Sequence, residues 1–217
     1  VAIVGGLVLE KGSVKDIAQA TAALIICGGT AGAVLLTSPL KVVLSAVSYL
    51  KEVFFERSVD ANSLIDEIIT YSTKARKQGI VSLEVEAANI GDPFLKKAIN
   101  LAVDGADIDD LKSMMELEIE QREHQAEEAA KVFESGGGYA PTVGIIGAVL
   151  GLIQVMKNLE NISEVGHGIA VAFVATVYGV ALANIFLLPA AGKIRSRASS
   201  QSKMREMALE GVIGMIE

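Results

Sequence analysis

The chain has 217 residues, a formal net charge of −7 and a mean hydropathy of +0.46. Half of its residues are apolar but only 5% are aromatic, so Ala, Val, Ile, Leu and Gly dominate, as they do in closely packed membrane helices. The negative charge argues against nucleic acid as a partner, and the single Cys27 excludes a disulfide framework or a cysteine metal cluster.

The first part of the chain contains two apolar runs, at residues 1–9 and 17–37, separated by a polar turn. A spanning helix needs about 20 residues. We therefore interpret residues 1–9 as the end of transmembrane helix 1, whose beginning lies outside this sequence; the alternative is a short buried helix. Residues 17–37 are long enough to form transmembrane helix 2. Their three glycines (Gly28, Gly29 and Gly32) would weaken a soluble helix but allow close packing in lipid.

Residues 38–138 have the composition of a helical cytoplasmic domain. Apolar residues recur at helical spacing without sustained alternation, so the sequence predicts an all-α fold. The expected elements are Leu40–Glu56, Ser63–Gly79 capped by Asn62 or Ser63, a short helix or turn in Val81–Ile90, a helix from Asp92 and Pro93 to Gly105, and an acidic helix Ile108–Ser135 capped by Asp109 or Asp110.

Three glycines at 136–138 then mark the start of the next membrane segment. They do not form a nucleotide-binding loop, because no Gly-Lys-Ser/Thr sequence follows. Two segments beyond them, residues 139–157 and 166–189, are predicted to form transmembrane helices 3 and 4, joined by a short outer loop at 158–165. The tail at 190–217 is rich in Lys and Arg near the helix end, which places it in the cytoplasm by the positive-inside rule. The sequence thus predicts a polytopic membrane protein with four crossings.

Small residues line one face of each of these two helices. The first face holds Gly144, Gly147 and Gly151, and the second holds Ala172, Thr176, Gly179 and Ala183. Such faces pack on each other or on a third helix. We interpret Gln154 and Asn184 as interhelical bonding groups, and His167 as an interfacial residue that could also titrate.

Thr176 places a hydroxyl in mid-span, flanked by Phe173 and Tyr178. The hydroxyl could bond the backbone of its own preceding turn or present an oxygen to a passing ion. Pro141 and Pro189 each free a backbone carbonyl and can bend their helices.

The segments 139–156 and 165–189 contain no Asp, Glu, Lys or Arg. Proton relay through a membrane normally uses a carboxylate or a similar group held at depth. If this protein moves ions, a helix of another chain must therefore bring the titrating group.

Three sequence motifs carry a family resemblance: ARKQGIVSLE at 75–84, YAPTVGIIGAVLGLI at 139–153 and VGHGIAVAFVATVYG at 165–179. Together they resemble the MotA-type stator subunits of flagellar motors, a family related to the ExbB and TolQ energisers. The resemblance implies a homo-oligomeric ring in the bacterial cytoplasmic (inner) membrane, a pentamer around a dimer of a MotB-type partner. That partner would supply a membrane Asp, and ion passage would drive the ring against FliG of the rotor.

The resemblance also implies roles for individual residues. Arg76 and Glu84 match rotor-facing charges, and Glu118 and Glu123 are further candidates for rotor contact. Thr176 matches a hydroxyl beside the partner's Asp, with Phe173 next to it, and Pro141 and Pro189 match prolines near the ion path. Ala148 stands where sodium-driven relatives carry Thr, which favours protons as the transported ion.

Two alternatives remain open at this stage. One is an ExbB- or TolQ-like energiser of outer-membrane processes, which places one helix before the cytoplasmic domain where this sequence predicts two. The other is a membrane scaffold without ion flux. We expect no enzymatic activity, no metal and no cofactor.

Overall fold

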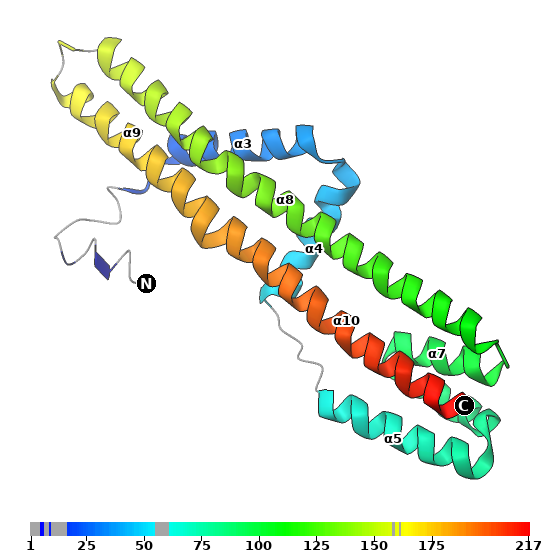
Figure 1. The fold of residues 1–217 in the computed structure, drawn as a ribbon. Helices are drawn as coiled ribbons and strands as arrows, with labels where there is room; N and C mark the ends of the chain where they lie inside the picture. The colour runs from blue at the N-terminus through cyan, green and yellow to red at the C-terminus, as the bar shows by residue number, and fades with distance from the viewer. Residues whose placement is uncertain (1–4, 7–8, 10–16, 55–60, 158, 161) are drawn as a thin grey trace. The chain divides into compact units, whose positions relative to one another are not determined.

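The computed structural model describes residues 5–6, 9, 17–54, 61–157, 159–160 and 162–217 (Figure 1). The described part is built from helices and short turns and contains no strand, which confirms the predicted all-α fold. The chain divides into two compact units. Unit 1 comprises Val1–Leu50 and Glu128–Gly192, and unit 2 comprises Lys51–Glu127 and Lys193–Glu217.

Unit 1 is formed around two antiparallel helical stretches, the second part of α8 (Ile108–Lys157) and α9 (Ile162–Ala181), which run side by side in Figure 1. Helix α3 (Ala20–Thr37) packs against α9 through a small core of Ala22, Ile26, Val174 and Ala175. Helix α4 (Leu40–Phe54) begins after a break in which Ser38 is extended. The break ends α3 at Thr37, where the sequence predicted the end of the apolar run at 17–37.

Three helices within the described residues are long and apolar enough to cross a membrane: α3, α8 and the continuous helix Ile162–Ile216. The predicted end of transmembrane helix 1, residues 1–9, lies largely outside the described residues.

The acidic helix does not end at Ser135, contrary to the sequence-based expectation. Helix α8 continues through the three glycines and through Pro141 to Lys157. Glycine weakens a helix in isolation, but here packing compensates. A methyl group added at Gly137 would lie 2.6 Å from Leu188 Cδ2, and one at Gly136 would lie 3.3 Å from Leu187 Cδ1. These glycines let the neighbouring leucines approach the α8 backbone.

The chain is also continuous around Pro189, where the sequence predicted a bend. Helix α9 passes into a π-helical segment, η2 (Leu182–Leu187), and then into α10 (Leu188–Ile216). Proline has no N–H group and its ring crowds the carbonyl four residues earlier. The wider π turn just before Pro189 relieves that crowding and lets the helix go on.

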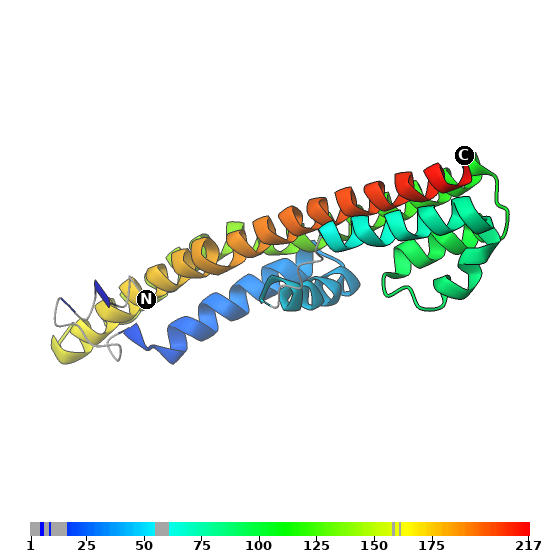
Figure 2. The ribbon, with the colours of Figure 1, turned by 90° about the horizontal axis from the view of Figure 1, so that it is seen from below.

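Unit 2 contains α5 (Ala61–Gln78), the 3-10 turn η1 (Ile80–Leu83), α6 (Glu84–Ala87) and α7 (Pro93–Val103), together with the first part of α8 and the second part of α10. Figures 1 and 2 both show α5 and α7 alongside these stretches of α8 and α10. Their apolar faces meet in one core, whose largest fully buried side chains are Leu83, Leu95, Ile99, Leu111, Met115 and Val212.

The predicted helix boundaries in unit 2 are partly confirmed. The Asp92 carboxylate accepts hydrogen bonds from the N–H groups of Phe94 and Leu95, with Pro93 at the first helical position. Gly79 and Gly105 adopt positive φ angles of 82° and 76° at the ends of α5 and α7, which glycine allows at no steric cost.

Two predicted helix caps were wrong. Helix α5 already includes Ala61, so neither Asn62 nor Ser63 caps it. Helix α8 is capped by Asp107, whose side chain accepts a hydrogen bond from the Asp109 N–H, and not by Asp109 or Asp110. Helix α4 is described as far as Phe54, and its predicted end at Glu56 lies outside the described residues.

Candidate functional site

Helices α8 and α9 meet along a seam of small residues, as the two predicted faces require. A methyl group added at Gly144 would lie 3.1 Å from the Ala175 carbonyl oxygen, and one at Gly151 would lie 3.1 Å from the Ala172 nitrogen. A methyl group added at Gly179 would lie only 2.5 Å from the Ala140 carbonyl oxygen. The two backbones are therefore in direct contact, which only glycine and alanine allow.

The seam places four of the predicted ion-path residues on one side. Because α8 and α9 are antiparallel, a residue that follows a contact residue, about 100° further round its helix, points to the same side on both helices. The contact residues Ala140 and Gly147 of α8 and Ala172 and Ala175 of α9 are followed by four of the predicted residues: Pro141, Ala148, Phe173 and Thr176.

The residues that precede the contact residues point to the opposite side, and Val143, Val174 and Tyr178 among them pack against α3. A methyl group added at Gly29 of α3 would lie 2.7 Å from Val143 Cγ1. Val174 and Tyr178 belong to the core shared with α3. The Tyr178 hydroxyl donates to the Ile17 carbonyl and accepts from the Gln19 N–H at 3.3 Å. Tyr178 thus flanks Thr176 in sequence but lies on the other side of the helix pair.

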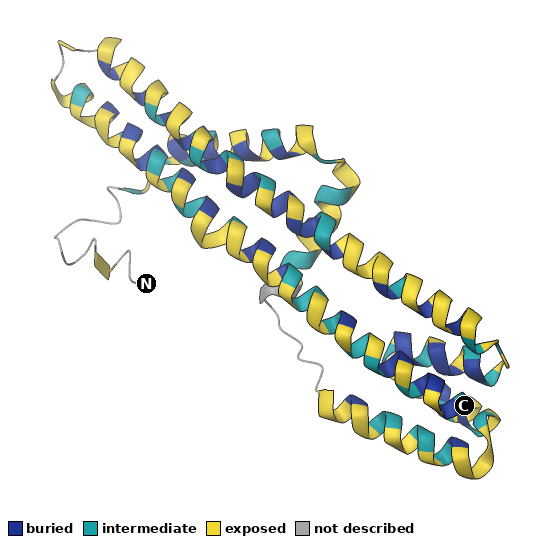
Figure 3. Cartoon of the chain, in the orientation of Figure 1, coloured by how far each residue is buried: buried dark blue, intermediate teal, exposed yellow. Residues whose placement is uncertain are grey.

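The side away from α3 has many exposed residues (Figure 3). Phe173 is 71% exposed, and it is accompanied by other exposed apolar residues on the two helices, which include Ile145, Val149, Leu152, Val177 and Val180. Ala148 and Thr176 are half-buried between them. The segments 139–156 and 165–189 contain no Asp, Glu, Lys or Arg.

The Thr176 hydroxyl donates to the Ala172 carbonyl oxygen of its own helix at 3.4 Å. The sequence left two roles open for this hydroxyl, and the structure shows the first of them, a bond to the backbone of its own preceding turn. The distance lies beyond the usual range for a hydroxyl donor, so the bond is weak and its loss costs little. The hydroxyl can rotate toward a charged group that approaches from the open side.

The other polar residues of these helices have separate roles. Asn184 donates through Nδ2 to the Val180 carbonyl oxygen of its own helix at 3.0 Å, so its predicted interhelical bond is wrong. Pro189 is exposed and follows the π segment. It does not belong to the group of four predicted ion-path residues beside the seam. Gln154 and His167 line a hollow of about 410 Å³ on the α3 side of the seam, together with Thr21 and Glu164.

The predicted rotor-contact residues Arg76 and Glu84 lie on the surface of unit 2, on either side of a tight turn. Arg76 is in the last turn of α5 and Glu84 is in the first turn of α6, and both are exposed. Between them, Leu83 is fully buried. Lys74 bonds Glu86 at 2.6 Å and joins the two helices. The turn therefore exposes the Arg76 guanidinium and the Glu84 carboxylate on a backbone that is held in place by Leu83 and by the Lys74–Glu86 ion pair.

Glu118 is engaged within the chain. Its carboxylate accepts from Lys97 of α7 at 2.7 Å and from Arg122 one turn later at 2.8 Å, and its side chain is only 19% exposed. The hydrogen bond from Lys97 is the main cause that lowers the pKa of Glu118; burial opposes it, and Arg122 adds to the lowering. Sequence reasoning missed Lys97 because the two residues are distant in sequence.

Glu123 lies on the exposed side of α8 and lines a hollow of about 350 Å³ with Glu120, His124 and Glu127. Arg195 of α10 also lines this hollow. Its guanidinium group donates two hydrogen bonds to the Glu127 carboxylate, from Nε to Oε2 at 2.8 Å and from Nη2 to Oε1 at 2.9 Å. This pair was also missed, since the 68 residues between its members leave no local signal. The structure separates Glu118, which is paired, from Glu123, which is on the surface.

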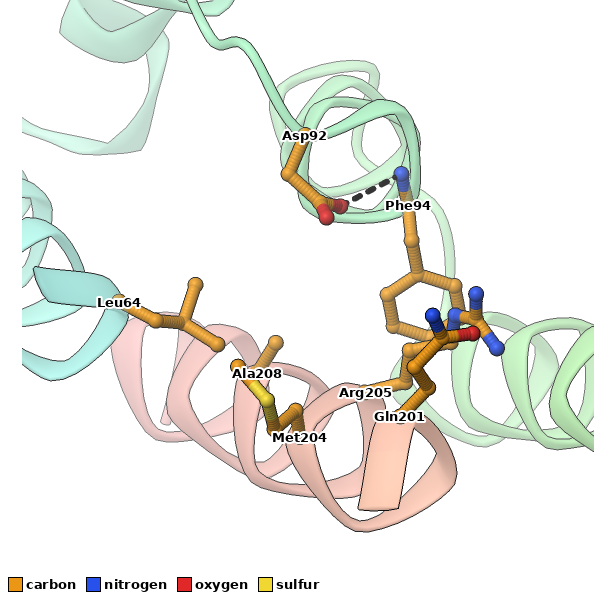
Figure 4. A pocket seen from close by; sticks show the side chains of 7 residues that line it. All are labelled: Leu64, Asp92, Phe94, Gln201, Met204, Arg205 and Ala208. Carbon is orange, nitrogen blue, oxygen red and sulfur yellow. Dashed lines mark hydrogen bonds between the residues drawn. The ribbon is translucent and has the colours of Figure 1, made fainter. Parts of the chain in front are cut away.

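A smaller hollow of about 180 Å³ lies between α5, α7 and α10 (Figure 4). Its walls are both apolar and polar: Leu64, Phe94, Met204 and Ala208 line it together with Gln201 and Arg205. The Asp92 carboxylate, which also lines it, is already used to cap α7. We assign no ligand to it. Within the described residues, no group of three His, Cys, Asp or Glu side chains could hold a metal ion.

Comparison with known proteins identifies the family. Residues 86–207 match the model of the MotA/TolQ/ExbB proton channel family, and residues 1–79 match the model of the Motility protein A N-terminal region. The chain is 34% identical to Motility protein A of Bacillus subtilis over 218 residues, which covers 100% of this chain and 81% of that protein.

The fold is shared with solved stator structures. The structure described as C. jejuni MotAB matches with a TM-score of 0.93 and 30% identity over 99% of this chain and 84% of that one. The flagellar MotAB stator complex of Bacillus subtilis matches with a TM-score of 0.88 and 34% identity over 100% of this chain and 85% of that one. The chain therefore belongs to the MotA/TolQ/ExbB proton channel family, as a flagellar stator subunit of the Motility protein A type.

Proposed function

We propose that the open side of the α8–α9 pair receives a membrane helix of a MotB-type partner, whose carboxylate completes a proton path beside Thr176. The observation that carries this proposal is an exposed apolar surface without a charge, on which Thr176 and Ala148 lie together. The solved relatives are MotAB complexes, which supports a partner of this kind.

The chemistry of the surface fits that division between two chains. A carboxylate held at membrane depth is costly unless a polar group satisfies it. The Thr176 hydroxyl can exchange its weak bond to Ala172 for a stronger bond to an ionised carboxylate, worth about 1.5–3 kcal/mol. It can release that bond when the carboxylate takes up a proton. The hydroxyl thus senses the charge state of the partner, and the reaction is transport without enzymatic catalysis.

We further propose the topology and assembly that the sequence predicted. Residues 1–9 are the end of transmembrane helix 1, and transmembrane helices 2 to 4 occupy residues 17–37, 139–157 and 166–189, in the bacterial inner membrane. Residues 38–138 and the tail at 190–217 are cytoplasmic, and 158–165 is outside. The subunits form a ring, a pentamer around a dimer of the partner. The apolar spans support the membrane part of this arrangement.

Torque is proposed to reach FliG of the rotor through Arg76 and Glu84. Their exposure supports this role, and exposed ion pairs, each worth roughly 0–1 kcal/mol, form and separate readily at each step. Glu123 is a further candidate. Glu118 would first have to leave Lys97 and Arg122, so in this proposal it stiffens the α7–α8 contact. The match of residues 1–79 to the Motility protein A N-terminal model favours the stator over an ExbB- or TolQ-like energiser.

Replacement of the Thr176 hydroxyl tests the ion path. Thr176→Val keeps the volume but removes the hydroxyl, and we expect a reduction in swimming speed and ion flux of about tenfold or more, from loss of a charged hydrogen bond. Thr176→Ser should restore both. Pro141→Ala should also impair motility while membrane assembly persists. Normal swimming in both Thr176→Val and Pro141→Ala strains would refute the assignment.

The choice of proton over sodium rests on Ala148. We expect swimming speed to be independent of sodium concentration and to collapse when a protonophore is added. Ala148→Thr should leave membrane assembly intact, because the position is only half-buried. Sodium-dependent swimming that survives the protonophore would contradict the proton assignment.

Charge reversal tests the rotor contact. Arg76→Glu or Glu84→Lys should lower torque, and a matching reversal on the rotor should restore it, because a repulsive pair becomes attractive again. Lys77→Glu, a neighbouring exposed cation on α5, serves as the control and should have a smaller effect. If reversal at Arg76 and Glu84 leaves torque unchanged, the two residues are not part of the contact.

A further inference from the structure

The segment formed by η1 and α6 has a buried side and an exposed apolar side. Leu83 and Ala87 are 0% and 2% exposed and belong to the core of unit 2. Val81 and Val85 alternate with them in sequence and are 62% and 74% exposed. The segment is therefore anchored by apolar burial on one side and displays two valines on the other.

The two valines are accompanied by charges that have no partner within the described chain. Glu84 lies between Val81 and Val85 in sequence, and Arg76 lies in the last turn of α5, just before the segment. Among the described residues, neither the Arg76 guanidinium nor the Glu84 carboxylate forms an ion pair with another side chain. A cation, a carboxylate and two apolar side chains are thus available to a partner at one place on unit 2.

Other polar side chains of the same two helices are used inside the chain. Lys74 of α5 donates to Glu86 of α6 at 2.6 Å, and the Tyr71 hydroxyl donates to Glu67 at 2.7 Å. The Lys74–Glu86 pair joins α5 to α6 without help from Arg76 or Glu84. The two unpaired charges are therefore not needed to hold this part of unit 2 together.

The charges alone would make a weak contact. An exposed ion pair changes a binding equilibrium by about fivefold at most, and salt screens it. Complete burial of one valine side chain changes an equilibrium by about tenfold or more. Two valines that are mostly exposed therefore offer a partner more binding free energy than the two charges do. An apolar centre with a polar rim is also the usual composition of a protein interface.

We propose that Val81 and Val85 form the apolar centre of the rotor contact, with Arg76 and Glu84 at its rim. This inference rests on the proposed contact of Arg76 and Glu84 with the rotor. The rotor surface that fits has apolar side chains flanked by a carboxylate, which meets Arg76, and by a cation, which meets Glu84. The valines supply the strength of the contact, and the charges set its register.

Polar replacement of both valines tests the proposal in cells that contain the whole chain, its partner and the rotor. Val81→Ser, Val85→Ser protein should lose about tenfold or more of the stall torque, because the apolar burial is lost. Val81→Leu, Val85→Leu protein, which keeps the surface apolar, should retain the torque. Both variants should assemble in the membrane as the parent does, because the replaced side chains are exposed. Full torque in the serine variant would overturn the proposal.

Arg76→Glu in the same strain separates this proposal from the rotor contact on which it rests. A charge reversal on the rotor should restore torque to Arg76→Glu protein but not to the serine variant. If Arg76→Glu lowers torque and the serine variant does not, the rotor contact stands and its apolar centre is wrong. If neither variant lowers torque, both proposals are wrong.

Photo-crosslinking identifies what covers the valines. Benzoylphenylalanine in place of Val85 should crosslink to FliG when swimming cells are illuminated. In place of Leu117, an apolar residue of α8 that is 54% exposed, it should not. A crosslink from position 85 to a second copy of this chain, without one to FliG, would assign the valines to a contact between copies and overturn the proposal. Absence of any crosslink to FliG in cells that keep full torque would also overturn it.

Discussion

The direct backbone contact between α8 and α9 is the constraint on which the rest of the structure depends. Gly179 against the Ala140 carbonyl, Gly144 against Ala175 and Gly151 against Ala172 leave no room for a larger side chain on either helix. In lipid, such close packing replaces the hydrophobic drive that holds soluble helices together. The seam also fixes the rotation of each helix, so it determines that Val143, Val174 and Tyr178 face α3 and that Ala148 and Thr176 face the open side.

That rotation gives the two sides of the pair different chemistry. The α3 side is closed by side-chain packing and by the Tyr178 hydroxyl. The open side is apolar and free of charge, and Thr176 is half-buried on it. A surface of this kind provides a wall and a hydrogen-bonding group but not a proton carrier. In the proposed function, the chain supplies one part of a site that a second chain completes. Helices α8 and α10 each continue from unit 1 into unit 2, which offers a route for transmission in that proposal.

Much of this arrangement follows from local sequence signals. The spacing of Gly144, Gly147 and Gly151 predicts the seam, Asp92 and Pro93 predict the start of α7, and Gly79 and Gly105 predict helix ends. The continuity of α8 through three glycines and of α9 through Pro189 could not be predicted. It depends on Leu187 and Leu188 packing on α8 and on a π segment, which are tertiary effects. The pairs Lys97–Glu118 and Arg195–Glu127 join distant residues, so no sequence window contains them.

The central claim is that backbone contact along the seam sets the geometry of the ion path. Gly179→Ala tests it, because the added methyl group meets a backbone carbonyl that cannot move without separating the helices. Gly166→Ala on the same helix is the control, since a methyl group there meets no atom within 4 Å. The thermal unfolding midpoint of the detergent-solubilised protein should fall for Gly179→Ala by the equivalent of about 1–3 kcal/mol, with loss of swimming, and stay unchanged for Gly166→Ala. Equal stability and equal swimming of the two variants would contradict the claim.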